Sequence, residues 1–219
     1  MTGAGGNPMH AKHRHLIAIL RGITATEAAD VCHVLADAGI TLIEIPLNSP
    51  RPLTSIRVAV KALAGKASIG AGTVLAPEEV DAIAQAGGRF IVSPDCNEAV
   101  IARTVAGGLQ SYPGIFSPTE AFRAIRAGAH ALKVFPAEVV GAKGIKAIKA
   151  VLPPAIPLYA VGGAHPDTFL EFVSAGCVGF GIGSYLYTPG AKLSDIAARA
   201  GAVVAAYDRA AGESQPVKA

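Results

Sequence analysis

Short apolar runs alternate along this chain with longer segments in which apolar residues recur every three or four positions. The short runs are typical of buried β-strands, and the longer segments are typical of amphipathic α-helices. Eight predicted strands follow one another from residue 16 onward, each followed by a predicted helix. They cover residues 16–21, 41–47, 68–74, 90–94, 108–113, 131–136, 157–162 and 177–183.

Eight repeats of strand and helix predict a (β/α)8 barrel, also called a TIM barrel. The alternative is an open, doubly wound sheet, but the count of eight and a last predicted helix near residues 193–209 favour the barrel. No linker or second core interrupts the pattern. We therefore expect one compact domain over residues 15–210, with flexible tails at residues 1–14 and 211–219.

The predicted strand at residues 131–136 carries one lysine among apolar residues. Because strand side chains alternate between faces, Lys133 shares its face with Ala131 and Phe135, while Leu132 and Val134 point the other way. Burial lowers the pKa of an amine and makes it a better nucleophile, so Lys133 is a candidate for Schiff-base formation. The alternative is a strand lysine that reaches solvent or pairs with a carboxylate.

Two further charged residues lie in apolar strands whose carboxyl ends would meet at the mouth of the barrel. Glu44 alternates with Ile43 and Ile45 and should point inward, either as a general acid/base or as the partner of an ion pair. Arg21 ends the first predicted strand, where its guanidinium would bind a carboxylate if it points inward, or form a surface salt bridge if it does not.

Glycines gather at the ends of the last two predicted strands. Gly162 and Gly163 follow the seventh strand, and Gly183 and Ser184 follow Gly181 in the eighth. Glycines there let backbone N–H groups approach an anion, as in many barrels with phosphorylated substrates, although they also permit tight turns. Their position favours a phosphate site. His165 would either touch that phosphate or only begin the next helix.

Composition narrows the class of protein further. Of 219 residues, 51% are hydrophobic and 16% are charged, which is typical of a globular protein, and the net charge of +3 comes without a basic run that would indicate nucleic-acid binding. No apolar stretch is long enough to span a membrane. Cys32, Cys96 and Cys177 are too few and too widely spaced for a disulfide framework, which favours a cytoplasmic protein. His10, His13 and His15 lack a supporting carboxylate, so we expect no metal site.

Five motifs occur in order along the chain: AILRGI at residues 18–23, IEIPLNSP at 43–50, GAGTVL at 70–75, PG at 113–114 and LKVFP at 132–136. Together they resemble the class I aldolases that split 2-keto-3-deoxy-6-phospho sugar acids. The resemblance runs from about residue 15 to about residue 208. It implies a Schiff-base lyase without a cofactor that acts as a homotrimer, and Lys133 as the Schiff-base lysine with Glu44 as the acid/base.

The resemblance also implies which residues bind substrate. Arg21 and Thr73 would hold the pyruvate carboxylate. The full set of implied substrate-binding residues is Arg21, Thr73, Pro94, Phe135, Val161, Gly162, Gly163, Gly183 and Ser184. The partners would be a phosphorylated 2-keto-3-deoxy sugar acid and its two cleavage products, pyruvate and glyceraldehyde 3-phosphate.

Within the family, the residues resemble the branch that acts on the galactonate epimer. That branch carries an arginine at the end of the first strand, as Arg21 does, and a valine at the position of Val161. The segment at residues 45–49 lacks the arginine typical of the gluconate branch. Glu138, His165 and residues 115–117 depart from the galactonate pattern. A gluconate aldolase, or an enzyme that accepts both epimers or 4-hydroxy-2-oxoglutarate, is the alternative.

Two readings from other classes are also open. A sugar-phosphate isomerase or epimerase on the same barrel would use carboxylates or a metal and would not need Lys133. A phosphate-binding barrel without activity would need neither Lys133 nor Glu44, so the presence of both argues against it.

Overall fold

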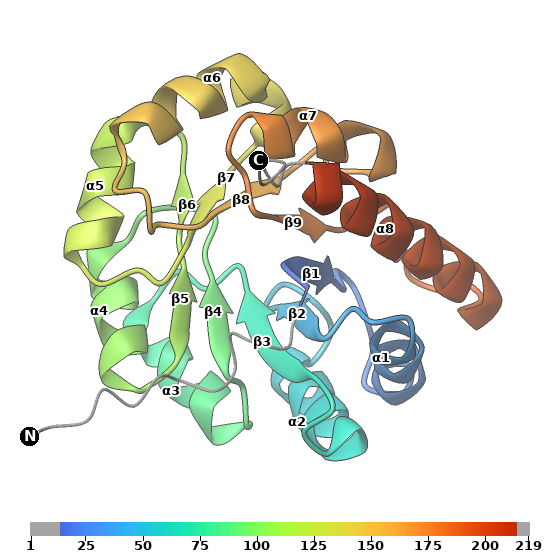
Figure 1. The fold of residues 1–219 in the computed structure, drawn as a ribbon. Coiled ribbons are helices and arrows are strands. Elements are labelled where there is room, and N and C mark those ends of the chain that lie inside the picture. The colour runs from blue at the N-terminus through green and yellow to red at the C-terminus, as the bar shows by residue number, and fades with distance from the viewer. Residues whose placement is uncertain (1–13, 214–219) are drawn as a thin grey trace, which may run out of the picture.

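A computed structural model describes residues 14–213 of the chain. One parallel sheet of nine strands curls into a barrel, in the order β5-β4-β3-β2-β1-β9-β8-β7-β6 (Figure 1). The strands are β1 (Leu16–Ile19), β2 (Leu42–Pro46), β3 (Ser68–Gly72), β4 (Phe90–Val92), β5 (Gln110–Tyr112), β6 (Gly114–Ile115), β7 (Leu132–Val134), β8 (Leu158–Val161) and β9 (Gly179–Ile182).

Helices surround the barrel, as predicted (Figure 1). They are α1 (Ala28–Asp37), α2 (Pro52–Leu63), α3 (Pro77–Gln85), α4 (Glu98–Ala106), α5 (Pro118–Arg126), α6 (Ala137–Val151), the short 3-10 helix η1 (Pro166–Thr168), α7 (Phe169–Ser174) and α8 (Leu193–Glu213). Asn97 caps α4 by accepting hydrogen bonds from two backbone N–H groups of its first turn. The (β/α)8 architecture expected from the sequence is confirmed.

The fifth predicted strand, residues 108–113, contains β5, and a second short strand that was not predicted, β6, follows directly after it. β5 pairs with β4, whereas β6 pairs with β7, and Pro113 lies between the two strands. The peptide N–H of Lys133 donates to the Pro113 carbonyl at 2.9 Å, and that of His130 donates to the Ser111 carbonyl at 3.0 Å. Proline has no N–H to give to a ladder, which explains the interruption. This one segment thus closes the ring between β4 and β7.

The alternation of side chains separates two apolar clusters. Leu132 and Val134 belong to the large cluster between the sheet and the helices, together with Ile43 and Ile45. Ala131 belongs to the small cluster inside the barrel, and Phe135 packs against it. Lys133 therefore points into the barrel, as its position in the strand predicts.

Aromatic rings fill the barrel near the amino-terminal ends of the strands. Tyr112 lies edge-on to Phe90 and to Tyr159, with ring centroids 5.9 and 5.5 Å apart. The Tyr159 hydroxyl lies 2.7 Å from Nδ1 of His15, the first residue before β1. His15, one of the three histidines considered above, thus helps to fill this end of the barrel; His10 and His13 lie outside the described residues. The opening is left at the other end.

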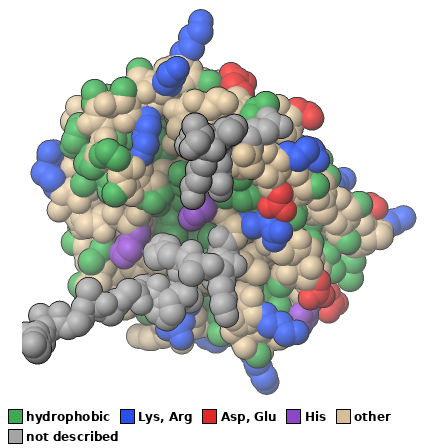
Figure 2. Space-filling view, viewed as in Figure 1, with side chains coloured by type: hydrophobic (Ala, Val, Ile, Leu, Met, Phe, Trp, Pro, Cys, Tyr) green, Lys and Arg blue, Asp and Glu red, His purple; other side chains and the backbone are tan. Residues whose placement is uncertain are grey.

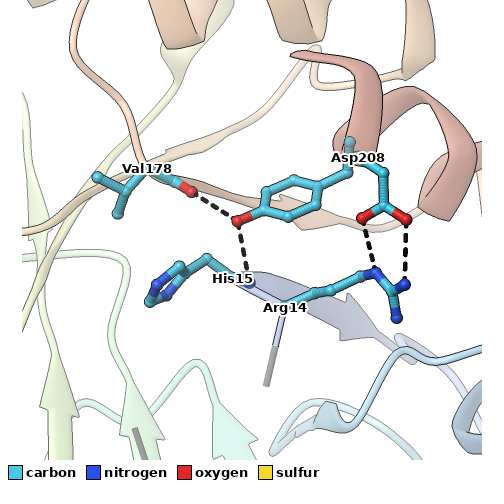
Figure 3. Close-up of polar contacts among 5 residues, drawn as sticks. Arg14, His15, Val178 and Asp208 are labelled. Carbon is cyan, nitrogen blue, oxygen red and sulfur yellow. Dashed lines mark hydrogen bonds and ion pairs between the residues drawn. The ribbon is translucent and has the colours of Figure 1, made fainter. Parts of the chain in front are cut away.

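The start of the described chain is attached to α8. Arg14 makes a bidentate ion pair with Asp208, with Nε 2.8 Å from Oδ1 and Nη2 3.0 Å from Oδ2 (Figure 3). Tyr207 accepts from the His15 N–H and donates to the Val178 carbonyl. The helix α8 runs to Glu213, beyond the expected end near residue 209. Of the predicted tails, only Arg14 and residues 211–213 are described.

Charged side chains are scattered over the surface. On the face shown in Figure 2, Lys and Arg are dispersed without a continuous basic patch, and Asp and Glu lie among them in the upper and right parts of the view. Among residues 14–213, no helix has the length and apolarity that a transmembrane span requires. In the same range, no three His, Cys, Asp or Glu side chains converge with the geometry of a metal site.

Candidate active site

A cavity of about 790 Å³ opens at the carboxyl ends of the strands. This is the end where (β/α)8 barrels carry their reactive residues. Of the residues implied as functional, the lining includes Arg21, Glu44, Lys133, Phe135, Val161, Gly162, Gly163, Gly183 and Ser184. The folded chain thus brings nine of the eleven implied residues to one space.

Lys133 lies in the middle of β7 and is only 7% exposed. Its Nζ lies 4.6 Å from the centroid of the Phe135 ring, which shares its face of the strand. Burial lowers the pKa of Lys133, the Glu44 carboxyl opposes this shift, and the Arg21 guanidinium adds to it. The side chain is therefore prepared to supply a neutral amine inside the cavity.

Glu44 lies in the middle of β2 and is 2% exposed. Burial raises the pKa of its carboxyl group, while Lys133 and Arg21 act in the opposite direction. Its Oε2 is buried without a hydrogen-bond partner. A carboxyl group with a raised pKa and an unused oxygen is suited to take up and release a proton close to the amine.

Gly72 makes room for that carboxyl group. β3 pairs with β2, and a Cβ atom at position 72 would collide with the side chain of Glu44, including its Oε1. A residue with any side chain would push the carboxyl group out of this place. This role of Gly72 was not predicted, because a glycine at a strand end indicates a turn as readily as a close contact.

Arg21 follows β1 and lines the cavity. Of the two positions considered for its side chain, inward or on the surface, the structure agrees with the inward one. Its Nη1 donates a 2.7 Å hydrogen bond to Oδ1 of Asn48 in the segment after β2. The hydrogen bond orients the guanidinium beside Glu44 and Lys133, whose pKa values it affects. Asn48 was part of a recognised motif, but its role as the partner of Arg21 was not predicted.

The opposite wall is made of glycines and hydroxyl groups. Gly162 and Gly163 have φ angles of 91° and 71°, in the region that favours glycine, and Ser184 follows Gly183. Side chains from the loop after β9 complete the wall, at Tyr185, Tyr187, Thr188 and Pro189. These four residues after Ser184 were not predicted to line the site, since no periodic pattern marks the loop.

The loop after β9 is tied to the start of α1 by Glu27. One carboxylate oxygen accepts from Thr24, with the hydroxyl at 2.6 Å, and the other accepts from the Gly190 N–H at 3.4 Å. Mainly through the Thr24 bond, the pKa of Glu27 is lowered. Burial, with this carboxylate nearby, raises the pKa of the Tyr187 phenol to about 12, so Tyr187 stays neutral.

Two implied residues do not line this cavity. Thr73 follows β3 with a φ of 57°, an unusual angle for a β-branched residue, and Pro94 follows β4. Pro94 instead lies against Gly114, where a Cβ atom would collide with its carbonyl. The strain at Thr73 lies one residue from Gly72 and hence next to the position of Glu44.

This geometry defines a class of protein: a parallel β/α barrel whose buried lysine and glutamate face an open cavity, with glycines and hydroxyl groups in its wall. Residues 9–200 match the family described as KDPG and KHG aldolase. The chain belongs to this family, and its members are carbon–carbon lyases.

Named relatives cover nearly the whole chain. A probable 2-dehydro-3-deoxy-6-phosphogalactonate aldolase of Rhizobium meliloti is 47% identical, over 95% of this chain and 98% of its own. The 2-dehydro-3-deoxy-6-phosphogalactonate aldolase of Escherichia coli is 49% identical, over 89% and 95%. A solved structure described as native KDPGal superimposes with a TM-score of 0.88 at 49% identity, over 90% of this chain and 96% of that one.

Proposed function

We propose that this protein is a class I aldolase that reversibly cleaves 2-dehydro-3-deoxy-6-phosphogalactonate to pyruvate and D-glyceraldehyde 3-phosphate. The observation that carries the proposal is the buried amine of Lys133, held with Glu44 in a cavity large enough for a phosphorylated six-carbon acid. The names of the two relatives at 47% and 49% identity support the galactonate substrate.

The first half of the reaction forms the Schiff base. The neutral amine of Lys133 attacks the C2 ketone to give a carbinolamine. The carbinolamine loses its hydroxyl group as water with a proton from protonated Glu44, which leaves a cationic iminium ion and the Glu44 carboxylate. The lowered pKa of Lys133 raises the fraction of neutral amine available for attack. The iminium ion withdraws electrons from C3, so the cleavage does not depend on a metal ion as electron sink.

The second half breaks the C3–C4 bond. Glu44, in its ionised form, takes the proton of the C4 hydroxyl group, and the bonding electrons move into an enamine as glyceraldehyde 3-phosphate forms. Glu44 then returns this proton to C3 of the enamine. Water hydrolyses the iminium ion to release pyruvate and neutral Lys133, and the proton set free returns to the Glu44 carboxylate. The unused Oε2 of Glu44 is free to exchange the proton in both steps.

The carboxylate end and the phosphate end of the substrate would bind to different walls of the cavity. Arg21, oriented by Asn48, would bind the carboxylate next to the ketone, with Thr73 after β3, on the far side of β2. Gly162, Gly163, Gly183 and Ser184 would hold the phosphate through N–H groups and a hydroxyl group. Binding at both ends keeps C2 beside Lys133 and C4 beside Glu44.

The substrate is tested by comparing kcat/KM for cleavage of the two C4 epimers, 2-dehydro-3-deoxy-6-phosphogalactonate and 2-dehydro-3-deoxy-6-phosphogluconate. The proposal predicts a higher kcat/KM for the galactonate epimer. A preference for the gluconate epimer would assign the protein to the other branch, and equal values would indicate dual specificity.

We also propose a cytoplasmic homotrimer. The three cysteines are free thiols, as is usual in a reducing compartment. Phe116 after β6 and Val139 in α6 are 50% and 66% exposed, and such apolar side chains are suited to cover by a second copy of the chain. Sedimentation equilibrium tests the oligomer: a mass of three chains supports it, and a mass of one chain contradicts it.

A further inference from the structure

We propose that His165 is a substrate-binding residue of this site, whose imidazolium pairs with the phosphate group of the substrate. The proposal rests on the function proposed above and assigns a residue that departs from the family pattern. His165 precedes η1, two residues after Gly163, and its side chain lines the cavity.

The ionisable side chains of the cavity divide into two groups. Arg21, Glu44 and Lys133 form the first group, because Arg21 and Glu44 shift the pKa of Lys133, and Arg21 and Lys133 shift the pKa of Glu44. These three serve the ketone and its carboxylate. On the wall with the glycines and Ser184, His165 is the side chain among the described lining residues that is able to carry a positive charge.

The backbone of His165 is already used within its own turn. Its N–H donates to Oγ1 of Thr168 at 3.1 Å, and its carbonyl accepts from the Thr168 N–H at 2.9 Å. Its N–H is therefore not free to bind an anion, and any contribution to phosphate binding must come from the ring. The same two hydrogen bonds fix the backbone from which the side chain extends at the cavity wall.

Negatively charged side chains lie near the proposed phosphate site. Oδ2 of Asp167 lies 3.5 Å from Nδ1 of His165, and a Cβ on Gly163 would lie 2.6 Å from Oε2 of Glu138. Two carboxylates thus flank the wall that is proposed to bind a phosphate dianion. Neutral N–H and O–H donors would have to hold the phosphate against this repulsion, whereas a charged imidazole offsets it.

The test compares the enzyme with the variants His165→Gln, which removes the charge, and His165→Lys, which keeps it. Kinetics at about pH 6, where protein imidazoles are mostly protonated, use the phosphorylated substrate and the same keto acid without phosphate. For His165→Gln we expect KM of the phosphorylated substrate to rise about tenfold, with kcat within twofold and no change for the unphosphorylated acid. His165→Lys should restore most of the affinity. His33→Gln, on α1, is the matched control.

Titration with inorganic phosphate gives a second readout that does not require turnover. Calorimetry should show a Kd for phosphate about tenfold higher in His165→Gln than in the unchanged protein. An equal Kd, or an equal rise of KM for both substrates, would overturn the role of His165 while leaving the aldolase function intact. Lack of cleavage together with a weakened phosphate Kd would instead reject the aldolase function and keep the role of His165.

Discussion

The carboxyl group of Glu44 occupies the space that a side chain at position 72 would need. The two residues come from neighbouring strands, β2 and β3, whose register places Pro46 opposite Gly72 and Glu44 opposite Gly70. The absence of a side chain on β3 lets the carboxyl group lie over the neighbouring strand, inside the barrel. The position of the proposed acid/base thus depends on a glycine in the adjacent strand.

Replacing Gly72 with alanine should therefore impair turnover. The added methyl group displaces the Glu44 carboxyl, so we expect kcat to fall about 100-fold, which is the scale of losing a general acid/base. Steady-state kinetics on the phosphorylated substrate measure this, with circular dichroism to confirm that the variant is folded.

Gly201→Ala is the control for Gly72→Ala. Gly201 lies in α8, and a Cβ there would meet no atom within 4 Å. This variant should keep full activity. A folded Gly72→Ala enzyme with unchanged kcat would show that Glu44 does not need its observed position.

The rate at which Lys133 reacts with pyruvate should rise with pH, and the charges of Glu44 and Arg21 should set the midpoint of this rise. Burial lowers the pKa of Lys133, so the rise should begin below the range of an ordinary lysine. Because the Glu44 carboxylate raises this pKa, Glu44→Gln should move the midpoint to lower pH. Because Arg21 lowers it, Arg21→Met should move the midpoint to higher pH.

Trapping by cyanoborohydride at a series of pH values measures these midpoints, independently of C–C cleavage. Lys146→Met, a change on α6 outside the cavity lining, serves as the control and should leave the profile unchanged. Shifts of the same sign in Glu44→Gln and Arg21→Met would contradict the arrangement of charges described here.

Two adjacent residues after α2 allow a clean test of backbone conformation. Ala64 and Gly65 are both exposed and both have left-handed φ angles, 44° and 85°. Ala64→Gly should raise the free energy of unfolding by about 0.5 kcal/mol, because glycine relieves the strain at Cβ at some cost in chain entropy. Gly65→Ala should lower it by about 0.5 to 1 kcal/mol. Thermal unfolding measures both changes. Changes of the same sign in the two variants would contradict the left-handed conformation of these residues.

The contacts at the start of β1 should contribute unequally to stability. The Tyr207 hydroxyl is held between the His15 N–H and the Val178 carbonyl, whereas Arg14 and Asp208 are 39% and 49% exposed (Figure 3). Tyr207→Phe should cost about 1 kcal/mol, and Asp208→Asn less than about 0.5 kcal/mol, since solvent screens the ion pair. Urea unfolding of both variants measures the two losses in free energy of unfolding. A larger loss in Asp208→Asn than in Tyr207→Phe would contradict this prediction.

Alternation along strands made the centre of the site predictable from sequence. The inward positions of Lys133 and Glu44 follow from their apolar neighbours, because a two-residue period leaves only two faces. The glycines at residues 162–163 were predicted to belong to the site because they follow the seventh predicted strand, and both line the cavity. The barrel itself followed from the count of eight repeats, a property of the whole chain rather than of any one motif.

Contacts between distant segments were not predictable in the same way. The need for Gly72 arises from a side chain on the neighbouring strand, and the hydrogen bond of Arg21 to Asn48 joins two loops. Pro113 separates β5 from β6, and these two strands pair with different neighbours, β4 and β7. Such relationships depend on the register of the sheet, which periodicity within one strand does not specify.

The central claim is that Lys133 forms a Schiff base with the keto acid. Borohydride reduction of the enzyme in the presence of pyruvate, followed by mass mapping of its peptides, tests this directly. We expect one stable adduct on the peptide that contains Lys133, and no adduct in Lys133→Met. Reduction that leaves Lys133 unmodified in the folded enzyme would contradict it.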